Sequence, residues 1–578
     1  MDGEPVRATT VGDILQDLLP RLHQQARLSD VLAWPPDVFA VCSRLLQLTG
    51  AYVRVVDLLN QTIERDADTW PEGARGVAAA WTRAVCLRTT APVDVPAEIS
   101  GWWHGVEQAR DLPLSEVRQD DRLTRCLLCL TCVADEASSG AGVGRVRRRS
   151  GVPDRVAKGR KEGSHDSALT AETAAEDLAK DRFVRLADDA LARHDFRTLC
   201  REVPCDRLSV LPKQHAPQRG LTLRSLSHHL AMSAEPELNA RWIGYDHSVR
   251  ANLNVLVVPW PLQIPTSAFR VRPHQGLPEK FRYFEFSRQG DPGLGERMAR
   301  YLCAAQAHAD RIDFVVLPEL SLTPDEYAQV EPVCLEHGVV LIAGVAEPEG
   351  PQGGPFNESV VQPAARYHPR HPMAWRDRAR VTQHKHHRWC LDAWQIPQYG
   401  LSGVLPSSRD CWEHIDISQG RTLNFHRFSP WLTLCVLLCE DLARQDPVAG
   451  VVRAVGPNLV VALLMDGPQL EGRWGSRYAT VLAEDPGCSV LSVTSLGMAN
   501  RSRPLRGGVD RSRVVGLFRD VYTGSHELQL DEGAEVGLLS LVTRAGTEFT
   551  ADGREDGGTA SFPVFSGFRS LTIDADGP

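Results

Sequence analysis

The sequence predicts an α/β protein, in which a layered α/β domain follows a helical first part. Short, continuous apolar runs alternate with helical segments from about residue 250 to 545, a pattern typical of strands covered on both faces. Before residue 136, apolar side chains instead recur three and four residues apart, as on one face of a helix. With 578 residues, the chain is too long for one hydrophobic core, and roughly two to four domains are expected.

Composition narrows the class of protein. Hydrophobic residues make up 43% of the chain and charged residues 24%, which is ordinary for a globular protein. The net charge of −9 argues against general nucleic-acid binding. The 14 cysteines are irregularly spaced, which favours free thiols in a reducing cytoplasm over a disulfide scaffold. The N-terminus shows no basic region followed by an apolar one, and no apolar run reaches about 18 residues. A cytoplasmic protein without a membrane partner is therefore expected.

Residues 1–136 are predicted to form an all-α N-terminal domain. The stretches 11–32 and 38–64 carry the helical spacing of apolar residues, and a helix at 121–137 closes this part. That last helix contains Cys-x-x-Cys-x-x-Cys, at residues 126, 129 and 132. An iron–sulfur site requires a fourth ligand, and none stands out, so core packing is favoured. No metal and no cofactor are predicted.

Residues 137–172 are rich in Gly, Ser, Arg and Lys and nearly free of large apolar side chains. Such a composition cannot bury a core, so a basic, Gly/Ser-rich linker is expected. Its arginine cluster at 145–149 is interpreted as part of a solvated linker rather than an anion site. Residues 173–248 are expected to form a helical connecting segment.

The α/β domain is predicted to span residues 249–546. Its apolar runs are interpreted as strands and the intervening amphipathic stretches as helices. The expected strands lie within 252–262, 312–320, 339–347, 432–439, 458–466 and 488–496, and the helices within 294–310, 324–338 and 475–485. Residues 547–578, which begin with a polar stretch, are expected to form a C-terminal tail.

Glu319 is the first candidate site residue. In "FVVLPELSLTPDEY" it follows a buried strand and a proline. The carboxyl ends of strands are where α/β sheets usually hold their sites. The competing interpretation is a carboxylate that merely precedes the next helix.

Lys385, in "RVTQHKHHRWCLDAWQ", is the second candidate. Only six of the 64 basic residues are lysines. Lysine and arginine are not chemically interchangeable, so a lysine here is informative. The adjacent His384, His386 and His387 suggest metal ligation only weakly, because neighbours in sequence rarely point at one ion.

Cys439, in "WLTLCVLLCEDLAR", is the third candidate. It ends an apolar strand at the turn into a helix. Taken alone, it is best explained as a buried core cysteine. A catalytic thiol requires a nearby base or cation to become a nucleophile, and Glu319 and Lys385 are the candidates for these roles.

The ordered set of Glu, Lys and Cys at successive strand ends resembles the carbon–nitrogen hydrolase, or nitrilase, superfamily. "VVLPELSLTPDEY", "HKHHRW" and "VLLCEDLAR" are similar to the segments that carry that family's glutamate, lysine and cysteine. "LLMDGPQ" and "RYATVLAEDPGCSVLSVTSLG" are similar to its later strands and helix. The interval from Lys385 to Cys439 is long for the family and implies an insertion around 399–421. The resemblance covers about 250–545 and leaves the first 245 residues unmatched.

The resemblance implies a nitrilase-like four-layer αββα sandwich and a Cys-Glu-Lys triad. Cys439 is then the nucleophile, Glu319 the general base, and Lys385 stabilises the oxyanion together with the backbone N–H of Glu440. Many family members also place a second glutamate shortly after the lysine. Here that interval offers Asp392 or a nearby glutamine, and whether Asp392 replaces the glutamate stays open. Family members commonly pair, so a homo-oligomer is implied.

The function expected from this resemblance is hydrolysis of a small-molecule amide or nitrile through a thioester. The helical N-terminal domain would then be regulatory or partner-binding. One alternative is a catalytically weak nitrilase-like scaffold that acts by binding a protein or nucleic-acid partner. Another is a regulated effector in bacterial defence or stress. The residues do not name the substrate, nor do they distinguish hydrolysis from acyl transfer.

Overall fold

The computed structural model describes most of the chain, with gaps between the following ranges: 8–23, 31–59, 69–87, 94–142, 167–193, 197–214, 220–235, 237–245, 251–272, 282–347, 355–364, 380–417, 420–502 and 512–573. The chain divides into two compact units. The first unit contains 1–236, 241–246 and 547–560, and the second contains 237–240, 247–546 and 561–578. The expected basic linker falls largely on 143–166, outside the described residues. No described helix is long and apolar enough to cross a membrane.

The first unit is mainly helical. Its α-helices are α1 Val11–Leu18, α3 Pro35–Thr49, α4 Val55–Leu59, α5 Trp70–Leu87, α6 Ala97–Gln108, α7 Leu114–Val117, α8 Asp121–Ala137 and α9 Ser167–Arg193. The Asp120 side chain caps α8 by accepting the Leu123 N–H. Helix α8 packs against α3, α5 and α6, and Cys126, Cys129 and Cys132 are buried on it. These three cysteines therefore belong to the core of this unit.

The expectation of a helical segment at 173–248 is wrong beyond Arg193. Strands β1 (Ser209–Pro212) and β2 (Leu230–Ser233) pair antiparallel, and β3 (Leu238–Gly244) follows. The first two strands have four residues each. Runs this short do not distinguish a strand from a turn of helix by their apolar spacing.

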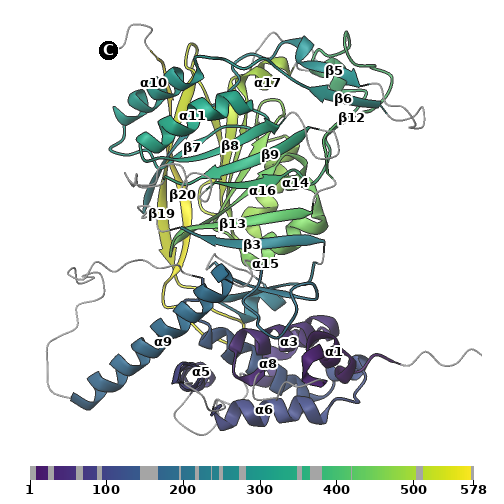
Figure 1. The fold of residues 1–578 in the computed structure, drawn as a ribbon, viewed down its shortest axis with the longest axis vertical. Coiled ribbons are helices and arrows are strands. Elements are labelled where there is room, and N and C mark those ends of the chain that lie inside the picture. Colours follow the sequence, from purple (N-terminus) through teal and green to yellow (C-terminus); the bar gives the residue numbers. More distant parts are fainter. Residues whose placement is uncertain are drawn as a thin grey trace, which may run out of the picture. The chain divides into compact units, whose positions relative to one another are not determined.

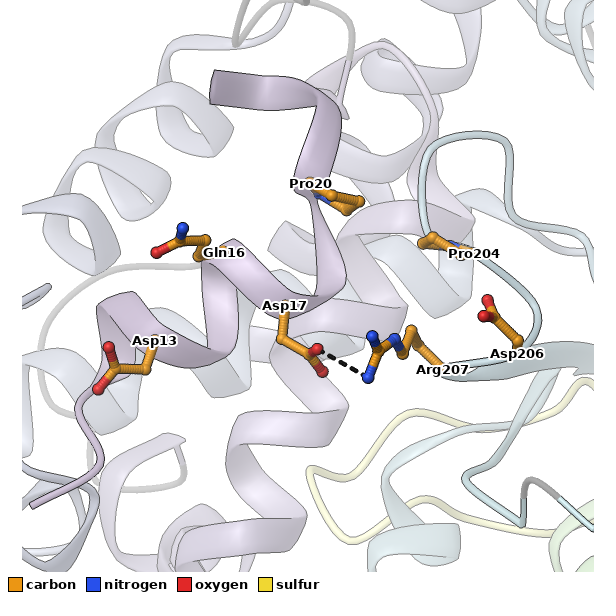
Figure 2. Close-up of a pocket in the computed structure, with 7 residues that line it drawn as sticks. All are labelled: Asp13, Gln16, Asp17, Pro20, Pro204, Asp206 and Arg207. Atoms are coloured by element: carbon orange, nitrogen blue, oxygen red, sulfur yellow. Dashed lines mark ion pairs between the residues drawn. The ribbon is translucent and has the colours of Figure 1, made fainter. Parts of the chain in front are cut away.

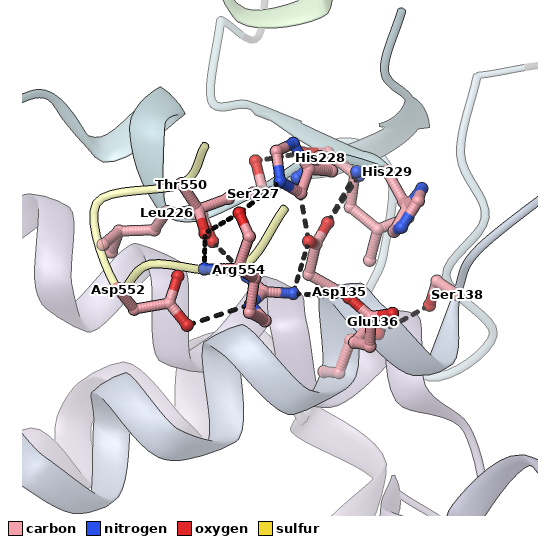
Figure 3. Close-up of polar contacts among 12 residues, drawn as sticks. Asp135, Glu136, Ser138, Leu226, Ser227, His228, His229, Thr550, Asp552 and Arg554 are labelled. Carbon is pink, nitrogen blue, oxygen red and sulfur yellow. Dashed lines mark hydrogen bonds and ion pairs between the residues drawn. The ribbon is translucent and has the colours of Figure 1, made fainter. Parts of the chain in front are cut away.

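The expected tail at 547–578 is also wrong, because its residues are built into both units. Residues 547–560 belong to the first unit, where Arg554 is completely buried. Its guanidinium contacts Asp552 at 2.9 Å and Asp135 at 3.1 Å, and donates to the Leu226 carbonyl at 2.8 Å. Figure 3 shows Arg554 between Asp552 of its own loop and Asp135 of α8. The polar character of the loop reflects a buried ionic network rather than exposure to solvent.

Asp135 extends this network to the segment before β2. Its carboxylate accepts the backbone N–H groups of His228 and His229 at 2.8 Å and of Leu230 at 2.9 Å. Burial raises the pKa of Asp135, but Arg554, the two histidines and the backbone N–H donors together outweigh it, so this pKa lies well below its ordinary value. Asp135 is thus held as an anion that organises the backbone around it.

The second unit contains two seven-stranded mixed sheets. The first has the order β10-β9-β8-β7-β4-β19-β20, and the second β18-β17-β16-β15-β14-β13-β3. The strands of the first are β4 Asn252–Val257, β7 Phe314–Val316, β8 Val340–Glu347, β9 Phe356–Gln362, β10 Val381–His384, β19 Val536–Gly546 and β20 Ala560–Leu571. Besides β3, the second has β13 Arg421–Ser429, β14 Leu432–Leu438, β15 Leu459–Leu464, β16 Ser489–Thr494, β17 Val514–Asp520 and β18 Gly524–Gln529. Parallel pairing links β4, β7 and β8 in one sheet and β14, β15 and β16 in the other, so the mixed α/β architecture is confirmed.

Helices flank these sheets. In Figure 1, α10 (Leu294–Gln306) and α11 (Pro324–Glu336) lie near β7 and β8, and their apolar residues share one core with those strands. Helices α14 (Glu440–Ala443) and α16 (Trp474–Glu484) contact the second sheet. The two sheets contact each other through β9 with β14 and β10 with β13. Strand ends from both sheets therefore meet near this contact.

A smaller sheet adjoins this region, with the order β11-β12-β6-β5. Its strands are β5 Phe269–Arg272, β6 Arg282–Phe286, β11 Cys390–Leu391 and β12 Cys411–Glu413, and the short helix α13 (Gln395–Gln398) lies between β11 and β12. Apolar side chains of this small sheet share a buried cluster with Leu320 and Met465 of the large sheets' loops. The insertion expected at 399–421 contains β12.

Candidate active site

The three candidate residues follow three strands of the two large sheets. Glu319 lies three residues after β7, Lys385 directly follows β10, and Cys439 directly follows β14. They are 3%, 2% and 1% exposed. Lys385 Nζ lies 2.8 Å from Glu319 Oε1, and the Cys439 thiol interacts electrostatically with both partners. The structure thus brings together all three residues singled out in the sequence.

The backbone at Cys439 adopts a sharp turn. Its φ is 43° and its ψ −103°, a conformation that the Cβ atom of a non-glycine residue disfavours. Among the described residues, the other non-glycine residue with positive φ is Leu320, next to Glu319. Strained backbone of this kind clusters at functional sites, where the surrounding structure enforces it. The turn presents the Cys439 side chain between the end of β14 and the start of α14.

Asp441 ties this turn to the segment that carries Lys385. Its carboxylate accepts the backbone N–H groups of His386 and His387 at 3.1 Å, and it lies 2.9 Å from His387 Nδ1. His386 Nε2 lies 2.9 Å from the carbonyl oxygen of Thr422. These histidines therefore make structural contacts, and no cluster suited to a metal ion occurs among the described residues.

A second carboxylate at Lys385 comes from Glu413 on β12. Glu413 Oε2 lies 2.6 Å from Lys385 Nζ and accepts the Trp389 N–H at 3.0 Å. Asp392, considered from the sequence for this place, instead accepts the N–H groups of Trp394 and Gln395 at the start of α13. Glu413 follows Lys385 by 28 positions and lies inside the insertion, so spacing to the lysine gave no signal for it.

Asn357, the second residue of β9, joins the two carboxylates. Its Nδ2 donates to Glu319 Oε1 at 2.8 Å and to Glu413 Oε1 at 2.9 Å. Its backbone carbonyl accepts the Lys385 N–H at 2.8 Å. Asn357 is buried and contacts every charged member of the site. Its position at a strand start, rather than a strand end, is why the sequence did not single it out.

Burial and charge shift the ionisation of the site. Burial, reinforced by the Glu413 carboxylate, raises the pKa of Glu319 despite the opposing effect of Lys385. Burial lowers the pKa of Lys385, but the Glu319 and Glu413 carboxylates outweigh it and raise that pKa well above its ordinary value. Burial and Glu319 raise the pKa of the Cys439 thiol well above its usual range, while Lys385 opposes this. In the resting site, the ammonium is charged and the thiol holds its proton.

A pocket in the first unit is a weaker candidate. It has a volume of about 510 Å³ and is lined by Asp13, Gln16, Asp17, Pro20, Pro204, Asp206 and Arg207 (Figure 2). Asp17 pairs with Arg207 at 3.1 Å, and Asp13 accepts the Thr10 N–H at the start of α1. These seven residues include no cysteine, serine, threonine, lysine or histidine, and two of the carboxylates already have structural partners.

Comparison with solved structures finds members of the nitrilase superfamily. Nit3 from Saccharomyces cerevisiae, a member of branch 10 of that superfamily, matches with 11% identity and a TM-score of 0.31, covering 51% of this chain and 92% of its own. An amidase from Nesterenkonia sp., with the acetamide moiety of fluoroacetamide added at its active-site cysteine, matches with 12% identity and a TM-score of 0.29, covering 50% and 91%. A carbon-nitrogen hydrolase from Helicobacter pylori matches with 13% identity and a TM-score of 0.28, covering 50% and 89%.

No family model matches the chain, and no curated protein matches it. The matches to solved nitrilase-superfamily structures extend over about half of the chain and leave the rest unassigned.

Proposed function

We propose that the second unit is a carbon–nitrogen hydrolase that cleaves an amide through a Cys439 thioester, within a four-layer αββα sandwich. One observation carries the proposal. A buried thiol on a strained turn lies in the electrostatic field of a buried Glu–Lys–Glu cluster, where the pKa of the Glu319 carboxyl is raised. A carboxyl whose pKa is raised toward neutrality is suited to take and return a proton.

The hydrogen bonds support different proposed roles for the two glutamates. Both oxygens of Glu413 have donors, from Asn357 on one side and from Lys385 and the Trp389 N–H on the other. Glu319 Oε2 has no hydrogen-bond partner among the described residues. Glu319 is therefore the proton acceptor, whereas Glu413 orients Lys385.

Lys385 is suited to stabilise an oxyanion. An ammonium has three N–H donors. Two of them are directed to Glu319 and Glu413, and the third is left for negative charge that develops on the substrate. The backbone N–H of Glu440, at the first position of α14, is the proposed second donor.

The reaction then proceeds in two halves. Cys439 Sγ attacks the carbonyl carbon, its proton moves to Glu319, and the resulting oxyanion is held by Lys385. Glu319 gives the proton to the amide nitrogen, the C–N bond breaks, and ammonia or an amine leaves a thioester. Water then attacks the thioester as Glu319 takes its proton. The C–S bond breaks, the acid leaves, and Glu319 returns the proton to the thiol.

The test measures the rate at which iodoacetamide alkylates Cys439, and the other cysteines of the chain serve as internal references. Cys303 is exposed, so exposure alone predicts that it is alkylated before the buried Cys439. We expect Cys439 to be alkylated faster, and this preference to be lost in Glu319→Gln and Lys385→Arg, as measured by peptide mass spectrometry. Equal or slower labelling of Cys439 in the wild-type protein contradicts the proposal and favours a non-catalytic scaffold.

The substrate is sought by comparing metabolites between cells that carry the wild-type protein and cells that carry Cys439→Ala. The variant is expected to retain its fold and to accumulate an amide that the wild-type protein consumes. Homo-oligomerisation and a regulatory or partner-binding role of the first unit belong to the same proposal, and the mass of the assembly in solution tests the first of these.

A further inference from the structure

Two buried acceptors in the site have no donor among the described residues: Glu319 Oε2 and Asn357 Oδ1. Both side chains are buried, with Glu319 3% and Asn357 1% exposed. Buried polar atoms are ordinarily hydrogen-bonded, so a pair of unpaired acceptors beside a nucleophile indicates where donors of a bound molecule belong.

The orientation of the Asn357 amide follows from its neighbours. Its Nδ2 donates to one oxygen of Glu319 and to one oxygen of Glu413. Turning the amide over would direct Oδ1 at two carboxylates, which is repulsive. Both N–H groups are thereby used, and Oδ1 is left as an acceptor only.

The two unpaired atoms flank one hydrogen bond. Asn357 Nδ2 donates to Glu319 Oε1 at 2.8 Å. Asn357 Oδ1 is bonded to the same carbon as the donor nitrogen, and Glu319 Oε2 is bonded to the same carbon as the acceptor oxygen. A substrate nitrogen whose N–H donates to Glu319 Oε2 therefore lies close to Asn357.

From this arrangement we propose that Asn357 is a substrate-positioning residue and that the site accepts the –NH₂ group of a primary carboxamide in preference to a nitrile. The inference rests on the carbon–nitrogen hydrolase function proposed above and specifies its substrate class. A primary amide carries two N–H donors, one for Glu319 Oε2 and one for Asn357 Oδ1. A nitrile carries none, and it leaves both buried acceptors unpaired, which is the kind of mismatch that discriminates most strongly between substrates.

Formation of the thioester requires only the thiol and the amide, and water then hydrolyses the thioester as described above. Attack by Cys439 forms the C–S bond, and the thiol proton passes through Glu319 to the amide nitrogen. The C–N bond then breaks and ammonia leaves. Asn357 supplies no proton; it holds Glu319 Oε1 so that Oε2 faces the nitrogen, and it accepts one N–H of the departing group.

Two reagents that differ only in the relevant group provide the test. Iodoacetamide and iodoacetonitrile share the same leaving group but carry –CONH₂ and –CN. The rate of alkylation at Cys439 is measured with each by peptide mass spectrometry on the full chain, and the ratio of the two rates is divided by the same ratio for free glutathione. We expect this normalised ratio to be about tenfold in favour of the amide, and that of the exposed Cys303 to be near one.

Asn357→Ala is expected to reduce the ratio at Cys439 toward one. Asn357→Ser, which retains a hydroxyl donor for Glu319, is expected to reduce it as well and serves if the alanine variant does not fold. Asn424→Ala is the matched control. Asn424 is also a buried asparagine whose Oδ1 has no partner among the described residues, but it lies on β13 and donates to the Thr382 carbonyl. This variant is expected to retain the wild-type ratio.

The outcomes separate the two proposals. Selective labelling of Cys439 with a normalised ratio near one overturns the amide preference and leaves the hydrolase standing. An equal fall of the normalised ratio in Asn424→Ala and Asn357→Ala also overturns the amide preference, because the fall then reflects a loss of stability. If Cys439 reacts no faster than Cys303 with either reagent, both the hydrolase and the amide preference are wrong.

Discussion

At the scale of single residues, the site contains two buried glutamates in different states of hydrogen bonding. Glu413 has a donor at each oxygen, and Glu319 has one oxygen free among the described residues. Two carboxylates and one ammonium leave a net negative charge in a buried place, which favours retention of a proton. Burial is the main cause of the raised pKa of Glu319; the Glu413 carboxylate adds to it, and Lys385 opposes it.

The first prediction follows from the charges around Glu319. The base must be ionised to accept the thiol proton, so Cys439 alkylation by iodoacetamide should fall as the pH drops through the raised pKa of Glu319. Glu413→Gln removes a neighbouring negative charge, which lowers that pKa, so the alkylation rate should fall at a lower pH than in the wild-type protein. Lys385→Met removes the opposing positive charge, which raises that pKa, so the alkylation rate should fall at a higher pH. Shifts in the same direction would contradict the proposed role of Glu319.

At the scale of elements, the close approach of β8 to the segment before α11 positions Glu319, the proposed base. The Gly344 N–H donates to the Pro318 carbonyl at 3.0 Å, and the Leu322 N–H donates back to Gly344 at 3.0 Å. A Cβ at residue 344 would lie 2.4 Å from the Pro318 oxygen and 2.5 Å from Glu319 Cα. Only glycine lets the two backbones pass at this distance.

The second prediction is that Gly344→Ala displaces Glu319. The contacts are with backbone, so the neighbouring chain must shift. We expect a loss of about 1–3 kcal/mol in the free energy of unfolding and a fall in Cys439 alkylation rate of roughly a hundredfold. Gly403→Ala, where an added Cβ meets nothing within 4 Å, is the control. Comparable rates in both variants would show that the approach of β8 does not position the base.

At the scale of the whole molecule, the chain does not stay in the second unit once it has entered it. Between two strands of the second unit, residues 547–560 belong again to the first unit. Strand β19 ends at Gly546 and β20 begins at Ala560, and the loop between them supplies Arg554 to the helical unit (Figure 3). Because a buried arginine is tolerated only when it is fully paired, this loop is an integral part of the first unit. That unit is therefore not separable by a single cut in the chain.

The third prediction tests whether the first unit depends on the loop that carries Arg554. Arg554→Met leaves Asp135 and Asp552 buried without their cation, which typically costs about 3–5 kcal/mol. Hydrogen exchange should show lost protection in α8 and at residues 228–230, with β14, β15 and β16 retaining theirs. Arg569→Met, at an exposed position on β20, is expected to change neither. Unaltered protection of α8 in Arg554→Met would contradict an organising role for the loop.

Much of the second unit could be predicted from the sequence, because continuous apolar runs mark strands buried on both faces. Glu319 and Cys439 were predictable for a related reason, since each lies at the end of such a run, whereas Lys385 was singled out because lysines are scarce in this chain. Strands β1 and β2 in the segment 173–248 were not predictable, because four-residue strands carry no periodicity. Neither was the place of 547–560, because its polar residues are buried by partners more than 300 positions away.

The sequence by itself therefore determines the mixed α/β class of the second unit and the three strand-end residues, because both depend on local patterns of apolar and polar side chains. Only the tertiary structure decides that Glu413, rather than Asp392, completes the charge cluster and that Asn357 holds both carboxylates. Those contacts depend on how a small inserted sheet packs beside two large ones. The physical reason is that hydrogen-bond partners are selected by proximity in space, and spacing along the chain does not encode proximity between strands of different sheets.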